Sequence, residues 1–198
     1  MRIEDESRKI IPVGLNKEMR LMMKTIYDKL SIRGRVAYAI MCFENYVNFK
    51  YPDKDMSNVA EIMWKIIDDS DYIDNSAYRY MEIIPEYLYE KDNFASLEFE
   101  FLSEQEYNYF ISLLPNPNND PDLNTIMHRI YDIAMKYAYT VVELDSWETK
   151  EYLQEVSNIL EKNNIPTPDI EKIPKYEWDD SHGWGKCFDG RYLSIILK

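Results

Sequence analysis

DPDLNTIMHRIYDIAMKYAYTVVE, residues 120–143, decides the fold class of this chain. Asp120 is a favourable N-cap and Pro121 suits a first helical turn, so a helix is expected to begin here. Apolar side chains then recur at helical spacing on two neighbouring strips, which leaves only a narrow polar stripe. A helix that is apolar over most of its circumference belongs inside a bundle. The stretch therefore predicts an all-α fold with this helix at its centre.

The rest of the chain divides into further helical segments at capping residues, prolines and polar turns. Ser31 is expected to cap one helix, and Ser103-Glu104-Gln105-Glu106 has the pattern of a capping box. Glycine is scarce, at 5 residues, which favours helix over sheet. Together with the central helix, these segments predict an orthogonal or irregular bundle of six to eight helices. The additional helices are expected over residues 16–30, 31–51, 57–67, 75–84, 85–90, 103–114 and 146–164.

Two short segments carry strand signals. Residues 97–101 alternate strictly between apolar and acidic side chains, which predicts one short strand. Near the C-terminus, Asp189-Gly190 separates two apolar runs, a pattern typical of a β-hairpin. We therefore expect a single domain, in which residues 1–164 form the bundle. Residues 165–198 are expected to form a proline-rich arm and a hairpin packed on it.

Length and composition favour a soluble globular protein. The chain has 198 residues, of which 45% are hydrophobic, enough for one domain with a substantial core. Residues 1–9 are charged and do not resemble a secretory signal, and no apolar run is long enough to span a membrane. Its 2 cysteines are too few for a disulfide framework. These features predict a cytoplasmic protein.

The net charge of −13 is concentrated in one part of the chain. Residues 51–110 hold 15 acidic and 4 basic residues, a net charge of −11. Such a field repels nucleic acid and anionic membranes and accelerates encounter with a basic protein. An acidic surface that only maintains solubility is the alternative interpretation.

The acidic region is also rich in tyrosine, which provides rigid contact area and a hydroxyl group for protein recognition. The alternative is that these tyrosines line the edges of helix packing. A calcium loop starting at Asp69 is not supported, because Tyr80 occupies the twelfth position, where such a loop requires a glutamate. The predicted protein-binding residues are Asp68, Asp69, Asp71, Asp74, Tyr78 and Tyr80.

No phosphate-binding, zinc-protease, paired-cysteine or serine-hydrolase motif is present, and no cofactor or metal is predicted. His128, on the central helix, is interpreted as structural. The only weak catalytic candidates are four residues near the C-terminus that combine carboxylates, an imidazole and a thiol. The same groups also form ordinary turns. These candidates are Asp179, Asp180, His182 and Cys187.

Charge and the missing motifs together predict a non-enzymatic, acidic protein-binding module that neutralises or sequesters a basic partner. By class it is similar to the small acidic immunity proteins that bacteria make against their own toxins, although no motif matches a particular family of them. One alternative is a small enzyme that uses the cluster from Asp179 to Cys187. Another is a structural homo-oligomer whose hairpin pairs across a two-fold axis.

Overall fold

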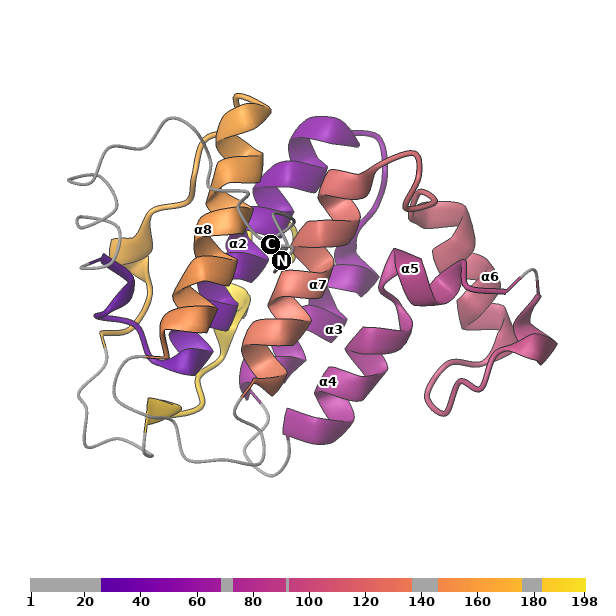
Figure 1. The fold of residues 1–198 in the computed structure, drawn as a ribbon, viewed down its shortest axis with the longest axis horizontal. Coiled ribbons are helices and arrows are strands. Elements are labelled where there is room, and N and C mark those ends of the chain that lie inside the picture. The colour runs from indigo at the N-terminus through magenta and orange to yellow at the C-terminus, as the bar shows by residue number, and fades with distance from the viewer. Residues whose placement is uncertain (1–25, 69–72, 92, 137–145, 176–182) are drawn as a thin grey trace, which may run out of the picture.

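The computed structural model describes residues 26–68, 73–91, 93–136, 146–175 and 183–198. In these ranges the chain forms an all-α bundle, as predicted (Figure 1). The seven α-helices are α2 (Ile32–Lys50), α3 (Ser57–Asp68), α4 (Ile73–Glu82), α5 (Pro85–Leu88), α6 (Glu104–Leu113), α7 (Pro121–Met135) and α8 (Trp147–Lys162). Three short 3-10 helices accompany them: η2 (Phe94–Ser96), η3 (Ile170–Lys172) and η5 (Gly190–Leu193).

Two helices, α2 and α7, share the centre of the bundle. The predicted central helix is present as α7, with the Asp120 side chain accepting from the Leu123 backbone N–H, while residues 137–145 lie outside the described ranges. Helix α7 packs against α2, α4 and α8, and α2 packs against α7, α8 and α3. Small residues such as Ala37 and Ala39 let neighbouring helices approach α2 closely, and α2 is buried on nearly all sides. The sequence predicts this helix, over residues 31–51, but not its central position.

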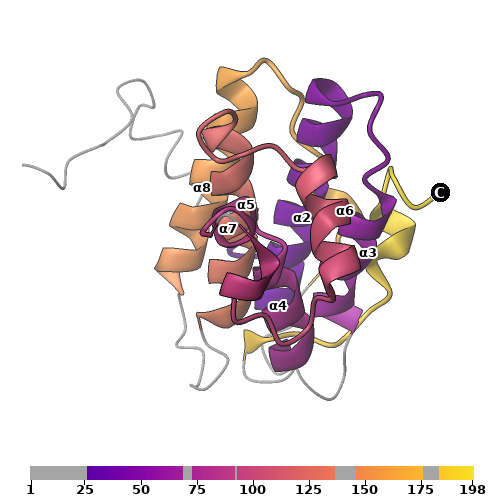
Figure 2. The same cartoon turned by 90° about the vertical axis from the view of Figure 1, so that its right-hand side faces the viewer.

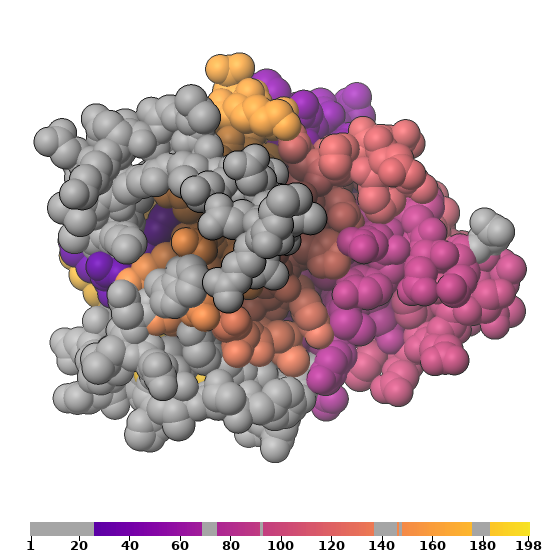
Figure 3. Space-filling view, viewed as in Figure 1, coloured from indigo at the N-terminus to yellow at the C-terminus, as the bar shows by residue number. Residues whose placement is uncertain are grey.

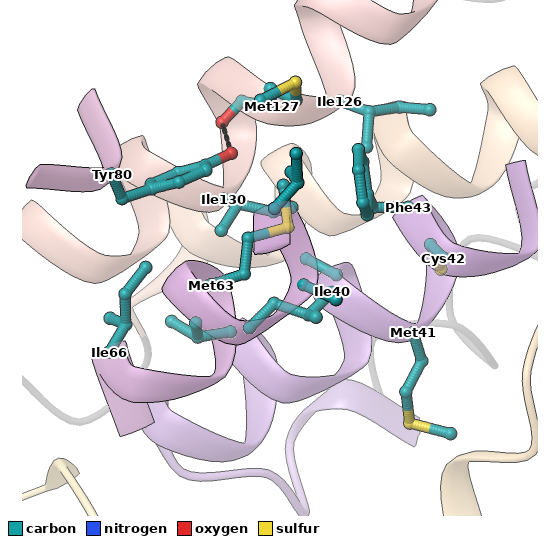
Figure 4. Packing of buried hydrophobic residues seen from close by; sticks show 14 of the residues in the cluster. Ile40, Met41, Cys42, Phe43, Met63, Ile66, Tyr80, Ile126, Met127 and Ile130 are labelled. Atoms are coloured by element: carbon teal, nitrogen blue, oxygen red, sulfur yellow. Dashed lines mark hydrogen bonds between the residues drawn. The ribbon is translucent and has the colours of Figure 1, made fainter. Parts of the chain in front are cut away.

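The core joins α2, α3, α4 and α7 through apolar side chains (Figure 4). Ile40, Met63 and Ile130, from three different helices, are fully buried. The hydroxyl of Tyr80 donates to the Met127 carbonyl oxygen at 2.6 Å, which satisfies one polar group inside this core. Burial of these side chains is the main force that holds the helices together.

The predicted strand at 97–101 is not formed. Backbone N–H groups at the end of this segment instead donate to the side chain of Glu82, at the C-terminal end of α4. The Glu82 carboxylate accepts from Glu100, Phe101 and Leu102 at 2.6 to 3.2 Å. The alternation still describes the side chains, because Glu98 and Glu100 are exposed while Phe99 is half-buried. A carboxylate thus replaces the partner strand.

The predicted C-terminal hairpin is also wrong for residues 183–198, which contain no strand. The Asp189 side chain accepts from the Arg191 backbone N–H and starts the 3-10 helix η5. Asp189 has φ −70°, and Gly190 is not among the glycines with positive φ, so the pair does not form the type I′ turn of a tight hairpin. Residues 183–198 therefore contain no strand through which two copies of the chain could pair across a two-fold axis.

Candidate protein-binding surface

The predicted acidic contact residues lie around the junction of α3 and α4. Asp68 is exposed at the last position of α3. Asp69 and Asp71 lie outside the described residues, and so does the side chain of Asp74, whose backbone belongs to α4. Among these four carboxylates, the structure therefore places only the Asp68 side chain on the surface.

The two predicted tyrosine contacts differ in exposure. Tyr78 is half-buried. Tyr80 is fully buried and faces α7, where its hydroxyl donates to Met127. Burial raises the pKa of Tyr80 well above its usual value. Tyr80 is therefore a core residue, and its assignment to a binding surface is wrong.

The weak catalytic cluster is mostly outside the described residues, which exclude Asp179, Asp180 and His182. The Cys187 side chain is exposed, whereas the Cys42 thiol is buried, and burial raises the pKa of Cys42. His128 lies on α7 with its Nε2 atom 2.7 Å from Glu86 Oε2, so it contributes to the contact between α7 and α5.

If His182 and Cys187 have only structural roles, separate His182→Ala and Cys187→Ala substitutions should shift the thermal midpoint without abolishing the cellular effect of the protein. Thermal unfolding and a cellular assay on the same variants test this. Loss of the cellular effect in both variants at an unchanged midpoint would instead support the enzyme hypothesis.

A different acidic surface is formed by the α5–α6 lobe, which we define as residues 85–91 and 93–114. It lies at one end of the molecule, beside the bundle of α2, α7 and α8 (Figures 1 and 2). In the space-filling view, the residues from α4 to α6 occupy the right-hand end of the molecule (Figure 3). The lobe contains six acidic residues and one basic residue, Lys91.

Three of the six carboxylates have no ion-pair partner among the residues that the structure describes. Glu98, Glu100 and Glu104 are exposed and follow one another along the segment that leads into α6. The other three acidic residues are each within ion-pair distance of a basic side chain: Glu86 with His128, Glu90 with Lys91 and Glu106 with Arg79. The lobe therefore presents uncompensated negative charge on one continuous segment.

Aromatic side chains lie next to these carboxylates. Phe94 and Phe99 are half-buried, and their rings pack on the buried Tyr107 with centroid distances of 5.5 and 6.3 Å. Tilted aromatic contacts of this kind fix the rings relative to one another. The half-buried rings of Phe94 and Phe99 therefore form a rigid, partly exposed apolar area within the lobe.

Helix α4 holds this segment in place with two side chains one turn apart. Glu82 binds three successive backbone N–H groups, as described above, and is itself buried. Arg79 donates to Glu106 Oε1 at 2.7 Å. Glu106 also completes a capping box with Ser103, as predicted from the sequence. The Ser103 backbone N–H, with a smaller contribution from Arg79, lowers the pKa of Glu106. The carboxylates of the lobe are thus displayed by a fixed backbone.

The sequence contains a pattern that marks this surface, but the strand prediction uses that pattern only for secondary structure. The acidic residues at alternate positions of 97–101 indicated a segment with one charged side. Glu104 appeared only as part of a capping box. Their exposure and their lack of partners depend on tertiary packing, which periodicity does not reveal.

The chain matches no protein-family model, and neither a characterised protein nor a solved structure is significantly similar to it. Within the described ranges, no group of three or more histidine, cysteine, aspartate or glutamate residues is placed to hold a metal ion. No helix in the same part of the chain is both long and apolar enough to cross a membrane. A functional proposal therefore rests on the chemistry of the lobe itself.

Proposed function

We propose that this protein is a non-enzymatic, acidic protein-binding module that docks onto a basic protein through its α5–α6 lobe. The observation that carries the proposal is the exposure of Glu98, Glu100 and Glu104 without ion-pair partners in the described structure. Uncompensated charge of one sign steers a partner of opposite charge and accelerates association. Phe94 and Phe99 provide apolar contact area beside that charge.

The partner class that fits is a basic, toxin-like protein. Such a partner would be neutralised by occlusion, in the way that small acidic immunity proteins act on toxins in bacteria. The negative lobe disfavours nucleic acid and anionic membrane as ligands, because both are negatively charged. We propose that this activity takes place in the cytoplasm, since 2 cysteines are too few for a disulfide framework.

The junction of α3 and α4 is a second candidate face for the same partner. Asp68 is exposed there, and Asp69, Asp71 and Asp74 follow it closely in sequence. The Asp189 carboxylate is the main cause that raises the pKa of Arg191, and the charge of Asp68 makes a smaller contribution. Of the four carboxylates, only the Asp68 side chain is described on the surface, which favours the lobe over this junction.

Partner capture from the native cell at low salt tests the proposal. We expect a basic protein to co-elute with the tagged chain and to be released by added salt, because screening weakens exposed charge interactions. A lobe variant with Glu98→Gln, Glu100→Gln and Glu104→Gln should lose most of this partner. The matched control carries Asp68→Asn, Asp69→Asn and Asp71→Asn and removes the same charge elsewhere.

The control variant should retain the partner if the lobe is the binding surface. Loss of the partner from the control alone would move the interface to the α3–α4 junction. Equal capture by all three proteins, or a partner without basic character, would contradict the proposal.

A further inference from the structure

The C-terminal segment Gly190–Leu197, which we call the strap, lies against α2 and α3 and is fixed there by one buried carboxylate. Glu44 of α2 is only 1% exposed. Its Oε1 accepts from Trp64 Nε1 at 2.7 Å and from Ser194 Oγ at 2.6 Å. Its Oε2 accepts from the Ile195 backbone N–H at 2.7 Å. One carboxylate therefore joins α2, α3 and the strap.

The strap also covers the side chain of Trp64 by close contact with Gly190. A Cβ atom at position 190 would lie 2.2 Å from Trp64 Cε3 and 2.6 Å from Ile67 Cδ1. Only glycine fits there without displacement of the backbone or the indole ring. Gly190 does not have a positive φ, so the requirement for glycine comes from this close contact and not from its backbone conformation.

The strap buries fewer apolar side chains than the helices do, so apolar burial holds it less strongly. Leu193 is buried, but Tyr192 is 62% exposed and Ile195 is 43% exposed. Segments with few buried apolar contacts open at lower free energy than the core of the same protein. Hydrogen bonds to a charged group are stronger than neutral ones, so Glu44 supplies a large share of what holds the strap.

We infer that Glu44 is a lock that keeps the strap closed over Trp64, and that the strap opens as a unit while the helical bundle stays folded. Opening uncovers Trp64 and Ile67 on α3 and frees the buried carboxylate to accept other donors. This conformational device is independent of the α5–α6 lobe and of the proposed partner.

Amide hydrogen exchange on the full-length chain tests the lock. Glu44→Gln keeps the size of the side chain but replaces one acceptor oxygen with an NH2 group that faces a donor. We expect exchange at Ile195, Ile196 and Leu197 to accelerate on the order of 10- to 100-fold, while the amides of α7 keep their rates. Glu104→Gln, which neutralises an exposed carboxylate on α6, is the control and should leave the strap unchanged.

Two outcomes would overturn the inference: an unchanged strap in Glu44→Gln, or acceleration of the strap and of α7 by the same factor. If Glu44→Gln does not fold, Ser194→Ala decides, because it removes one donor to Glu44 Oε1 and leaves the carboxylate in place. Faster exchange at Ile195, with unchanged rates in α7, would support the lock, and unchanged exchange at Ile195 would refute it.

Discussion

Ile130→Asp should unfold the protein. Ile130 is fully buried on α7, one of the two central helices, and packs in the cluster shared with α2, α3 and α4 (Figure 4). An aspartate at this position must either stay ionised and lose its hydration, or become protonated in a site that offers its carboxyl group no hydrogen-bond partner. Such substitutions cost more than about 4 kcal/mol, a large part of the roughly 5–15 kcal/mol that stabilises a typical domain.

Far-UV circular dichroism and thermal unfolding measure this effect. Ile130→Val is the matched control, since it removes one buried methylene group and should cost only about 0.5–1.5 kcal/mol. A cooperative helical spectrum in Ile130→Asp, with a midpoint close to that of Ile130→Val, would contradict the assignment of α7 to the core.

Glu82→Gln should have the second-largest effect, and one centred on the lobe. The buried Glu82 carboxylate accepts from three successive backbone N–H groups, and glutamine offers a single acceptor oxygen to them. At least one buried N–H group then loses its partner, which costs about 1–3 kcal/mol. We expect lower stability in denaturant unfolding and faster amide exchange at Glu100, Phe101 and Leu102.

Glu104→Gln is the control for this experiment, because it neutralises an exposed carboxylate of the same lobe. It should leave both the stability and the exchange of residues 100–102 nearly unchanged. If Glu82→Gln behaves in the same way, the carboxylate does not hold the segment, and the display of the acidic side chains has another cause.

Local signals in the sequence predicted helices α2 to α8, whereas most of the helix expected over residues 16–30 lies outside the described residues. The Ser31 side chain accepts from the Gly34 backbone N–H, and Ser103 and Glu106 form the expected capping box. Both motifs act over three residues, so sequence alone defines them. The central position of α2 was missed because its burial comes from three neighbouring helices, which no local pattern records.

The failed strand predictions have one physical cause. Alternation at 97–101 and Asp-Gly at 189–190 are local strand signals, but in both places a carboxylate caps the backbone N–H groups instead. Glu82 comes from a different helix, and Asp189 caps its own turn. Periodicity does not show which acceptor a backbone N–H group will find.

The candidate surface was predictable only in its charge. The acidic excess of residues 51–110 predicted a partner of opposite charge, and that expectation remains a proposal. The contact residues were less predictable, since Tyr80 is buried and three exposed carboxylates of the lobe, which the contact prediction did not include, have no ion-pair partner in the described structure. Exposure depends on tertiary packing, which the sequence pattern does not specify.

The association rate of the purified partner, measured by stopped flow at two salt concentrations, tests the proposed function most directly. The native chain should associate more slowly at the higher salt concentration, because screening weakens electrostatic steering. Neutralising Glu98, Glu100 and Glu104 together should slow association and flatten its salt dependence, whereas Phe99→Ala should mainly accelerate release. Association rates that change neither with salt concentration nor with the triple substitution would contradict a protein-binding role for the α5–α6 lobe.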